Sequence, residues 1–385
     1  MPATTTELAQ SATAEGEDAV RSACGEAVDS LPGDASLVIA FTSGELDQDR
    51  SAAALREAAP EAVTVGISGQ GAFGPGKPID HGCAAIAFDR SLRCSVGVGR
   101  NAGADLRSAG RAAARPALEA LVADDGDSLL LVLLDARSGD LAEAIAGVEE
   151  VSGPAIPMAG GAAGGPEPSQ YANGEALTDA VVAVGIRSPR PMGVGNAQTS
   201  KVVGEPGIVT HSEGRQIFEI DGRPAEDVYV EQLGFDDVRM KDEEFEAMAM
   251  THPLSQPQLH GGRRLRQVLG RAPEGGLLCA APIPSAAAIE FTELSTEALI
   301  RSGWDSVTAA LEPLEPGAVR AALVFDSANR RRALGDAQGA EVDAIAESFG
   351  SETPPLGGIY TNGEIARARG AKGDHHHAVV TVAFA

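Results

Sequence analysis

The segment AALVFD at residues 321–326 belongs to a pattern that the chain contains twice. Its counterpart is LLLVLLD at residues 129–135, and in both copies the apolar run ends in an aspartate that a polar, helix-like stretch follows. The tripeptide Asn-Gly-Glu comes later, at residues 173–175 and 362–364. From aspartate to asparagine the separation is 38 residues (173 − 135) in one copy and 36 (362 − 326) in the other. A fixed order at nearly fixed spacing indicates a duplicated supersecondary unit.

A third, weaker copy precedes the other two. Residues 37–41 predict a buried strand, residues 49–59 a helix, and residues 63–71 a strand that runs into a glycine-rich turn. An Asn-Gly pair is a strong signal for a two-residue hairpin, which joins antiparallel strands. We therefore predict the α/β class with mixed α+β sheets, in two domains built from related strand–helix–strand units with Asn-Gly hairpins.

Composition along the chain predicts three segments. Residues 1–35 are expected to form a polar tail and one helix, which ends at a Pro-Gly breaker at residues 32–33. The first domain is expected over residues 36–228 and the second over residues 229–385. The boundary is placed just before an acidic, irregular stretch at residues 235–257.

The chain is strongly acidic. Its 385 residues carry a formal net charge of −25, and only four of the 30 basic residues are lysines. High acid content with scarce lysine resembles proteins of a salt-accumulating archaeon, because at molar salt the Debye length falls to about 3 Å and an acidic surface no longer repels itself strongly. An ordinary acidic protein is the alternative. Either way, this charge disfavours nucleic acid as a partner, which needs a clustered basic face.

Two further patterns bear on location. No apolar stretch reaches the roughly 18 residues that predict a membrane span. The polar, acidic start lacks the basic region and apolar core of a secretion signal, so a cytoplasmic location and no membrane partner are expected. The four cysteines are scattered without C-x-x-C spacing, which is typical of a reducing compartment and gives no sign of a metal site.

Three motifs resemble known sites but depart from them. Residues 71–77 (GAFGPGK) have the spacing of a phosphate-binding loop, yet Pro78 follows and no helix pattern does, so a glycine-rich hairpin is predicted. Ser68 stands in GISGQ, which misses the nucleophile elbow at its last position. The histidine tract at residues 375–377 precedes a terminal strand and is interpreted as the solvated start of that strand rather than as a metal site.

Several segments, in order, resemble a known family. VGISGQG at 65–71, GGAAG at 160–164 and EIDGRPA at 219–225 are similar to the N-terminal FIST domain. HPL at 252–254, FDSANR at 325–330, PLGGIY at 355–360 and NGEI at 362–365 are similar to the C-terminal FIST domain. The resemblance spans about residues 36 to 370. It implies a sensory module that binds small ligands, with amino acids among the candidates. Some members bind haem and respond to nitric oxide.

One departure from the family pattern affects the haem alternative. Members often carry a cysteine before the arginine that follows the third-copy strand, where this chain has Ser327 before Ala-Asn-Arg. Any redox or haem role of that cysteine is therefore in doubt here. The expected state is without a cofactor. If haem does bind, His252 and His211 are the unassigned histidines that would hold it.

The ligand pocket is expected among the glycine-rich turns and the C-terminal Asn-Gly-Glu loop, since pockets prefer domain interfaces. Arg330 would pair bidentately with a ligand carboxylate, and Tyr360, Asn362 and Glu364 would hold its amino or polar end. The full set of predicted ligand-binding residues is Arg330, Gly357, Gly358, Tyr360, Asn362, Glu364, Gly160, Gly161 and Ser68.

The expected function is a cytoplasmic sensor of a small molecule. The 385 residues contain no kinase, cyclase or receiver sequence, so output through a signalling partner in trans is expected. A hydrolase is the weaker alternative. It has no catalytic motif, and its best support is the grouping of Glu364 with nearby histidines.

Overall fold

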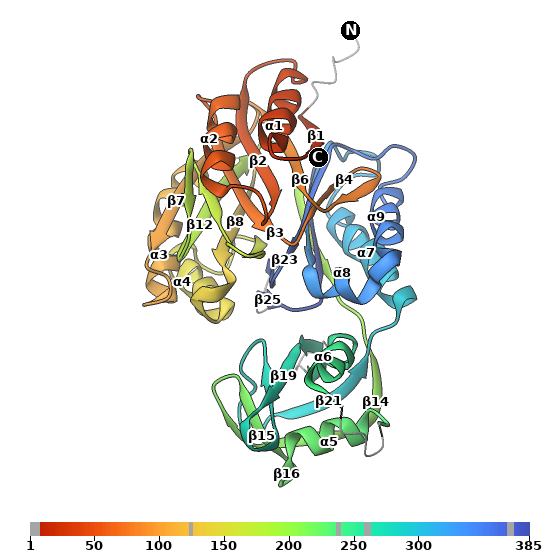
Figure 1. Ribbon diagram of the computed structural model, residues 1–385. Helices are drawn as coiled ribbons and strands as arrows, with labels where there is room; N and C mark the ends of the chain where they lie inside the picture. The colour runs from red at the N-terminus through yellow and green to blue at the C-terminus, as the bar shows by residue number, and fades with distance from the viewer. Residues whose placement is uncertain (1–7, 123–125, 236–239, 258–262, 368–372) are drawn as a thin grey trace.

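Three related units and one inserted domain make up the protein (Figure 1). The computed structural model describes residues 8–122, 126–235, 240–257, 263–367 and 373–385. In Figure 1 the three units lie together in the upper part, and the inserted domain, residues 198–295, lies below them. The predicted class is confirmed: the sheets are mixed and the units are related.

Each unit runs strand, helix, strand, helix, strand, and then a hairpin and a last strand. The first unit comprises β1 (Ala9–Glu15), α1 (Ala19–Asp29), β2 (Ala35–Ser43), α2 (Gln48–Ala58), β3 (Val63–Gly69), the hairpin β4 (Ala72–Gly74) and β5 (Lys77–Ile79), and β6 (Gly82–Asp89). The second comprises β7 (Arg93–Arg100), α3 (Leu106–Ala117), β8 (Asp127–Asp135), α4 (Leu141–Ser152), β9 (Met158–Ala163), the hairpin β10 (Gln170–Ala172) and β11 (Glu175–Leu177), and β12 (Ala180–Ser188).

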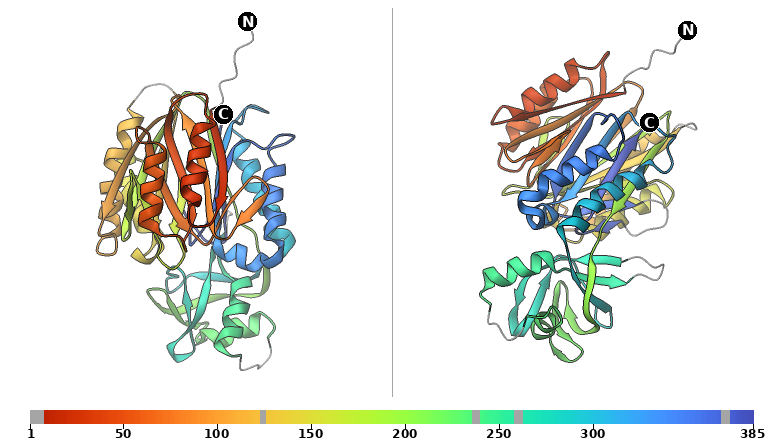
Figure 2. Two further views of the ribbon diagram at one scale, coloured as in Figure 1. Left: turned by 45° about the horizontal axis from the view of Figure 1, so that its top comes forward. Right: turned by 90° about the vertical axis from the view of Figure 1, so that its right-hand side faces the viewer.

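The third unit contains the insertion, and its second helical segment is divided. It comprises β13 (Met192–Ala197), α7 (Thr296–Leu311), β22 (Ala321–Ser327), α8 (Ala328–Leu334), α9 (Gln338–Glu347), β23 (Leu356–Thr361), the pair β24 (Glu364–Arg367) and β25 (Asp374–His375), and β26 (Val379–Phe384). The inserted domain leaves after β13 and returns before α7, so two connections join it to the body (Figure 2).

Every sheet of the body is completed by a hairpin from another unit. The strand orders are β1-β6-β2-β3-β10-β11, β7-β12-β8-β9-β24-β25 and β13-β26-β22-β23-β4-β5. The two central strands run parallel in each sheet, and their neighbours are antiparallel. Because the first unit lends its hairpin to the third, the second to the first and the third to the second, the three units are interlocked in a cycle.

A ring of six backbone hydrogen bonds closes this cycle where the chain crosses from one sheet to the next. The bonds run from Gln70 N to Tyr360 O (2.9 Å), Tyr360 N to Gly71 O (3.1 Å), Asn362 N to Ala162 O (2.9 Å), Ala162 N to Gly363 O (2.8 Å), Gly164 N to Ser68 O (3.0 Å) and Ser68 N to Ser169 O (2.9 Å). Gln70, Gly164 and Asn362 therefore occupy equivalent positions in the three units.

The central strands of the body are mostly apolar because both faces of their sheets are covered. In β8, Leu129, Leu131 and Leu133 belong to the central core that the three sheets share. The alternate residues Leu130 and Leu134 face the core under α3 and α4. This two-sided burial is why the run at residues 129–134 lacks the alternation of polar and apolar residues that marks a half-exposed strand.

The inserted domain has its own sheet and core. Its elements are β14 (Lys201–Glu213), β15 (Gln216–Ile220), β16 (Arg223–Pro224), α5 (Ala225–Gln232), α6 (Asp242–Thr251), β17 (Leu254–Pro257), β18 (Arg263–Arg266), β19 (Val268–Ala272), β20 (Gly276–Cys279) and β21 (Ala288–Glu293). The strand order is β18-β17-β21-β14-β15-β20-β19, with β16 beside β15. The predicted boundary between residues 228 and 229 lies within α5, and the division into 36–228 and 229–385 stays a prediction.

The structure corrects two local predictions. Residues 9–15, expected in a polar tail, form β1, which pairs with β6 along its whole length. Asn173-Gly174 is a hairpin turn as predicted, but Asn362-Gly363 carries the chain from β23 to β24, which lie in different sheets. The two Asn-Gly-Glu tripeptides are thus not equivalent, because Asn362 corresponds to Gly164 in the ring. The glycine-rich hairpin over residues 71–77 is confirmed as β4–β5.

Among the helices of the described residues, none is long and apolar enough to cross a membrane.

Candidate functional site

A cavity of about 490 Å³ lies where the strand ends of the first unit meet α8 of the third. Its walls come from the loops after β2 and β3, from the crossover of the second unit and from α8. The lining residues are Ser43, Gly44, Glu45, Gly69, Gln70, Gly71, Asp80, Gly165, Pro166, Arg331 and Arg332. All three units therefore contribute to this cavity, which we call the α8 pocket.

Glycine is required in its walls because backbones approach one another there. A Cβ on Gly44 would lie 2.7 Å from the carbonyl oxygen of Gly164, far inside van der Waals contact. Gly71 has φ +103°, a conformation that side chains disfavour, and its Cβ would lie 2.2 Å from Nη1 of Arg331. The glycine-rich turn at residues 69–71 thus allows the chain to cross from one sheet to the next and allows α8 to pack close to the first unit.

Three consecutive arginines on α8 point in three directions, since each residue of a helix is rotated by about 100° from the last. Arg330 is fully buried, Arg331 is mostly buried, and Arg332 is exposed. The guanidinium of Arg331 lies over the ring of Tyr360 at 4.8 Å and binds the carbonyl of Gln70 and the carboxylate of Asp80. Arg331 thereby fixes α8 to the first unit.

Arg332 presents its charge to the α8 pocket. It donates to Oε1 of Gln70 at 2.5 Å, and Nε2 of Gln70 donates to Oδ1 of Asn362 at 3.1 Å. Gln70 is its sole hydrogen-bond partner within the described part of the chain, so most of its donors face open space. The exposed carboxylates of Glu45 and Asp80 lie on the same cavity. The pocket thus combines a positive and a negative wall.

Arg330, predicted to bind the ligand, lies in the interior. It donates to Asp326 at 2.9 Å, to Glu341, to the hydroxyl of Ser302 at 2.8 Å and to the carbonyl of Leu299 at 2.8 Å. Burial raises the pKa of both Asp326 and Glu341, against the pull of the Arg330 charge. The guanidinium donors of Arg330 are therefore bonded to Asp326 and Glu341 inside the protein, and Arg330 does not line the α8 pocket. The pair Asp326 and Arg330, spaced i and i+4, was the sequence signal for this.

The predicted glycines and Ser68 have packing roles. A Cβ on Gly160 would lie 2.0 Å from the carbonyl of Val132, and one on Gly358 would lie 2.2 Å from the ring of Phe73. Gly161 faces Thr361, and Gly357 faces the ring of Phe41 in the same close manner. Ser68 donates to the carbonyl of Gly164 at 3.1 Å and accepts from the amide of Ser169 at 2.9 Å, so its hydroxyl is committed to the ring.

The predicted residues of the C-terminal loop divide between pocket and interior. Asn362 is exposed and reaches the α8 pocket through Gln70. Tyr360 is buried under Arg331. Glu364 is buried too: it accepts from the amide of Ala378 at 3.1 Å and from the hydroxyl of Thr361 at 3.3 Å. Burial raises the pKa of Glu364 to about 8.

The two histidines of the haem alternative lie in the inserted domain. His211 is on β14, beside the ring of Phe218 and 3.8 Å from Glu213. His252 follows α6, and its Nδ1 lies 2.8 Å from the carbonyl of Met248. Neither lines the α8 pocket. Across the described residues, His, Cys, Asp and Glu form no group of three or more that could hold a metal ion.

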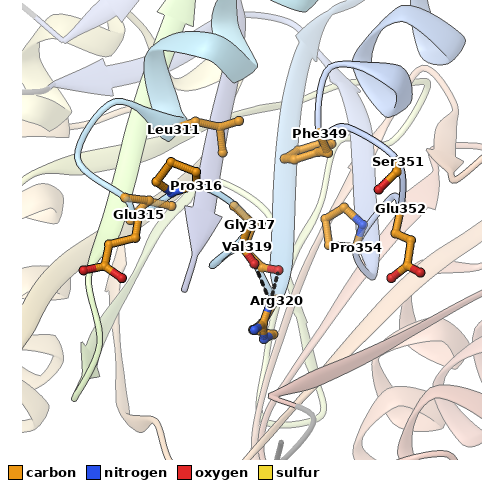
Figure 3. Close-up of a pocket in the computed structure, with 11 residues that line it drawn as sticks. Leu311, Glu315, Pro316, Gly317, Val319, Arg320, Phe349, Ser351, Glu352 and Pro354 are labelled. Carbon is orange, nitrogen blue, oxygen red and sulfur yellow. Dashed lines mark hydrogen bonds between the residues drawn. The ribbon is translucent and has the colours of Figure 1, made fainter.

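A second cavity, of about 420 Å³, opens at the opposite end of the third unit (Figure 3). Arg320 is the one basic residue in its wall, and its Nη1 donates to the carbonyls of Gly317 and Val319 at 3.0 Å each. Glu315 and Glu352 extend on either side (Figure 3). This cavity is a weaker candidate for a charged ligand than the α8 pocket, because Arg320 is bonded to backbone carbonyls and the residues on either side are acidic.

Two family models together match most of the chain. The model of the FIST N domain matches residues 36–223, and the model of the FIST C domain matches residues 225–367. No curated protein matches the chain. Among solved structures, the crystal structure of a cyanuric acid hydrolase from A. caulinodans is similar, with 12% identity and a TM-score of 0.37 over 97% of this chain and 98% of that one.

Proposed function

Because the chain is a FIST-domain protein, with the N domain followed by the C domain, we propose that it is a cytoplasmic sensor that binds a small zwitterion, an amino acid first, in the α8 pocket. FIST domains are associated with sensory signal transduction and the binding of small ligands. A volume of about 490 Å³ is within the range of small-molecule sites and larger than an amino acid needs.

The observation that carries the proposal is the pairing of opposite charges across one cavity. Arg332 is exposed there with most of its donors open, which suits a carboxylate, since a guanidinium can hold both oxygens. Glu45, whose carboxylate lies 3.7 Å from Nδ1 of His81, is the acidic group for an ammonium, whereas Asp80 binds Arg331. Gln70, held between Arg332 and Asn362, would fix the spacing of the two ends.

The same helix supports a route from pocket to output. Arg332 faces the α8 pocket, while Leu334, the last residue of α8, packs with Leu265 of the inserted domain. Arg330 lies 3.4 Å from the carbonyl of His377, and the ring of His377 contacts Gln267 of the inserted domain. A ligand that pulls Arg332 towards the α8 pocket would therefore move α8 and change how the inserted domain packs against the body. A signalling partner in trans would recognise that change.

Thermal unfolding of the full chain in concentrated KCl, with one amino acid at a time, tests the proposal. A ligand at 100 times its dissociation constant stabilises the fold by about 2.7 kcal/mol. We expect one chemical class of amino acid to raise the unfolding temperature, and Arg332→Gln to abolish that rise. Arg90→Gln is the matched control, because Arg90 is also an exposed arginine and is paired with Asp34 at 3.1 Å, away from the α8 pocket. A rise that Arg332→Gln leaves intact would place the ligand elsewhere.

A further inference from the structure

A second charged cluster lies where the inserted domain meets the body. Strand β18 of the inserted domain brings Arg264 and Arg266 onto a single carboxylate, that of Asp374 on β25. The side chains are 13%, 4% and 3% exposed, respectively. In Figure 1, β25 lies at the lower end of the body, facing the inserted domain. We call this cluster the joint.

The charges at the joint do not balance. Two buried guanidinium groups share one carboxylate, which leaves one positive charge without a counterion among these three residues. Arg266 uses one nitrogen, Nη2, at 3.1 Å from Asp374, while its Nε and Nη1 have no hydrogen-bond partner in the described structure. Burial and the charge of the neighbouring Arg264 together lower the pKa of Arg266 to about 10, against an opposing effect of Asp140. A buried charge without a partner is costly and calls for an anion.

No neighbouring side chain pairs directly with that charge. The carboxylate of Asp140 raises the pKa of both arginines through its charge, but among the described residues no ion pair or hydrogen bond joins it to either one. Burial lowers the pKa of His375 to about 4 and that of His377 to about 3, so both rings are neutral at pH 7, and Nδ1 of each has no partner. Arg367 beside the joint is already paired with Glu149 at 2.7 Å. His376 and His377 are buried and His375 is half-buried, and the ring of His377 contacts Gln267 of the inserted domain. The interpretation of a solvated strand start is therefore wrong.

There is room for a small molecule at the same place. A cavity of about 460 Å³ is lined by Arg264 and Asp374 from the two sides of the joint. Its other charged lining residues are Arg107, Glu143, Glu149 and Arg367. Arg107 and Arg367 are each paired with glutamates of α4. Arg264 lines the cavity and Arg266, on the same strand, does not, and both arginines share the single carboxylate of Asp374.

We propose that the joint is a binding site for a small oxyanion, a phosphate or a carboxylate, which Arg264 and Arg266 hold between the inserted domain and the body. Guanidinium groups present paired donors that match the oxygens of either group, and desolvated ones bind most strongly. The bound oxyanion neutralises Arg264 and Arg266, which β18 of the inserted domain presses against Asp374 of the body. It thereby stabilises the docked position of the inserted domain. This site does not rest on the amino-acid pocket.

Inorganic phosphate is the first probe, with malonate as the carboxylate arm. Thermal unfolding of the full chain is followed while phosphate replaces chloride at constant ionic strength, because screening alone stabilises an acidic protein. We expect a saturable rise in unfolding temperature. Arg266→Gln should abolish it. Arg90→Gln should keep it, and so should Arg332→Gln, which separates the joint from the α8 pocket. A rise with phosphate alone identifies a phosphate site, and a rise with malonate alone identifies a carboxylate site.

Asp374→Asn gives a test with the opposite sign and guards against a variant that fails to fold for other reasons. Removing the carboxylate leaves two unpaired guanidinium groups, so the unfolding temperature should fall. The probe anion should then raise it by more than in the wild-type protein, and should bind more tightly. If neither the wild-type protein nor Asp374→Asn responds to phosphate or malonate beyond the effect of chloride, the proposal is overturned.

Discussion

Two units of the body place different chemistry at the same point of the fold. Thr42 in the first unit and Asp326 in the third both pair, across a parallel ladder, with a residue of the backbone ring, Ser68 and Tyr360 respectively. The hydroxyl of Thr42 lies 2.8 Å from that of Tyr171, which donates to Gln48 at 2.5 Å. At this point the first sheet therefore satisfies its buried polar side chains without any ion.

The third unit uses ions instead. Asp326, Arg330 and Glu341 form a buried group in which two carboxylates face one guanidinium. Such a group is weak evidence for stability, because desolvation of the charges offsets their attraction. The first unit demonstrates that the fold does not need it. The charged group occurs in the unit that contacts the inserted domain and supplies α8 to the pocket, which associates it with function rather than with folding.

The largest expected effect comes from breaking the charged group. Arg330→Met leaves two buried carboxylates without their cation and should lower the free energy of unfolding by about 3–5 kcal/mol at pH 7. Denaturant unfolding, followed by the fluorescence of Trp304, the single tryptophan, measures it. A loss below about 1 kcal/mol would contradict an ionised group and favour carboxylates that are already protonated.

Glu364 gives the next effect, which depends on pH. Its folded pKa of about 8 is above the usual 4.5, so the folded state prefers the protonated acid. Its contribution to stability is therefore fully present below about pH 4.5 and is lost as the pH rises through 8. Glu364→Gln cannot ionise and should gain stability relative to the wild-type protein between pH 5 and pH 8.5. An identical stability difference at the two pH values would mean that Glu364 titrates normally.

The neutral group of the first sheet, to which the second unit contributes Tyr171 on β10, should give the smallest loss. Tyr171→Phe removes the hydroxyl between Thr42 and Gln48 and leaves their polar atoms buried without this partner. A cost of about 1–2 kcal/mol is expected, measured by the same denaturant unfolding. If Tyr171→Phe proved as damaging as Arg330→Met, the contrast between the two units would disappear.

The sequence predicts the units better than it predicts their assembly. Apolar runs that end in a polar residue recur in all three units, because each strand must be buried on both faces, and this signal is local. The exchange of hairpins leaves no such local signal, since it depends on hydrogen bonds between residues far apart in the chain, such as Gln70 N to Tyr360 O. The Asn-Gly pair at 362–363 misled for this reason: Gly363 has φ +138°, yet the turn leads into another sheet.

The candidate site follows the same division. The sequence places the pocket among glycine-rich turns, and the α8 pocket has glycines at residues 44, 69, 71 and 165. It selects Arg330 for the ligand, whereas Arg332 faces the cavity. Three adjacent arginines differ by rotation around the helix, so their roles depend on where α8 packs. Nothing in the sequence indicates that His376 and His377 are buried, or that His377 contacts the inserted domain.

Hydrogen–deuterium exchange of the full chain, with and without the amino acid that gives the largest thermal shift, tests the central claim most directly. The account predicts slower exchange in peptides that contain residues 69–71 and α8, because the ligand would bridge Glu45 and Arg332 across them. Arg332→Gln should remove that protection, and Arg90→Gln should not. Protection confined to the inserted domain around His211 and His252, with no change at α8, would contradict the proposed pocket.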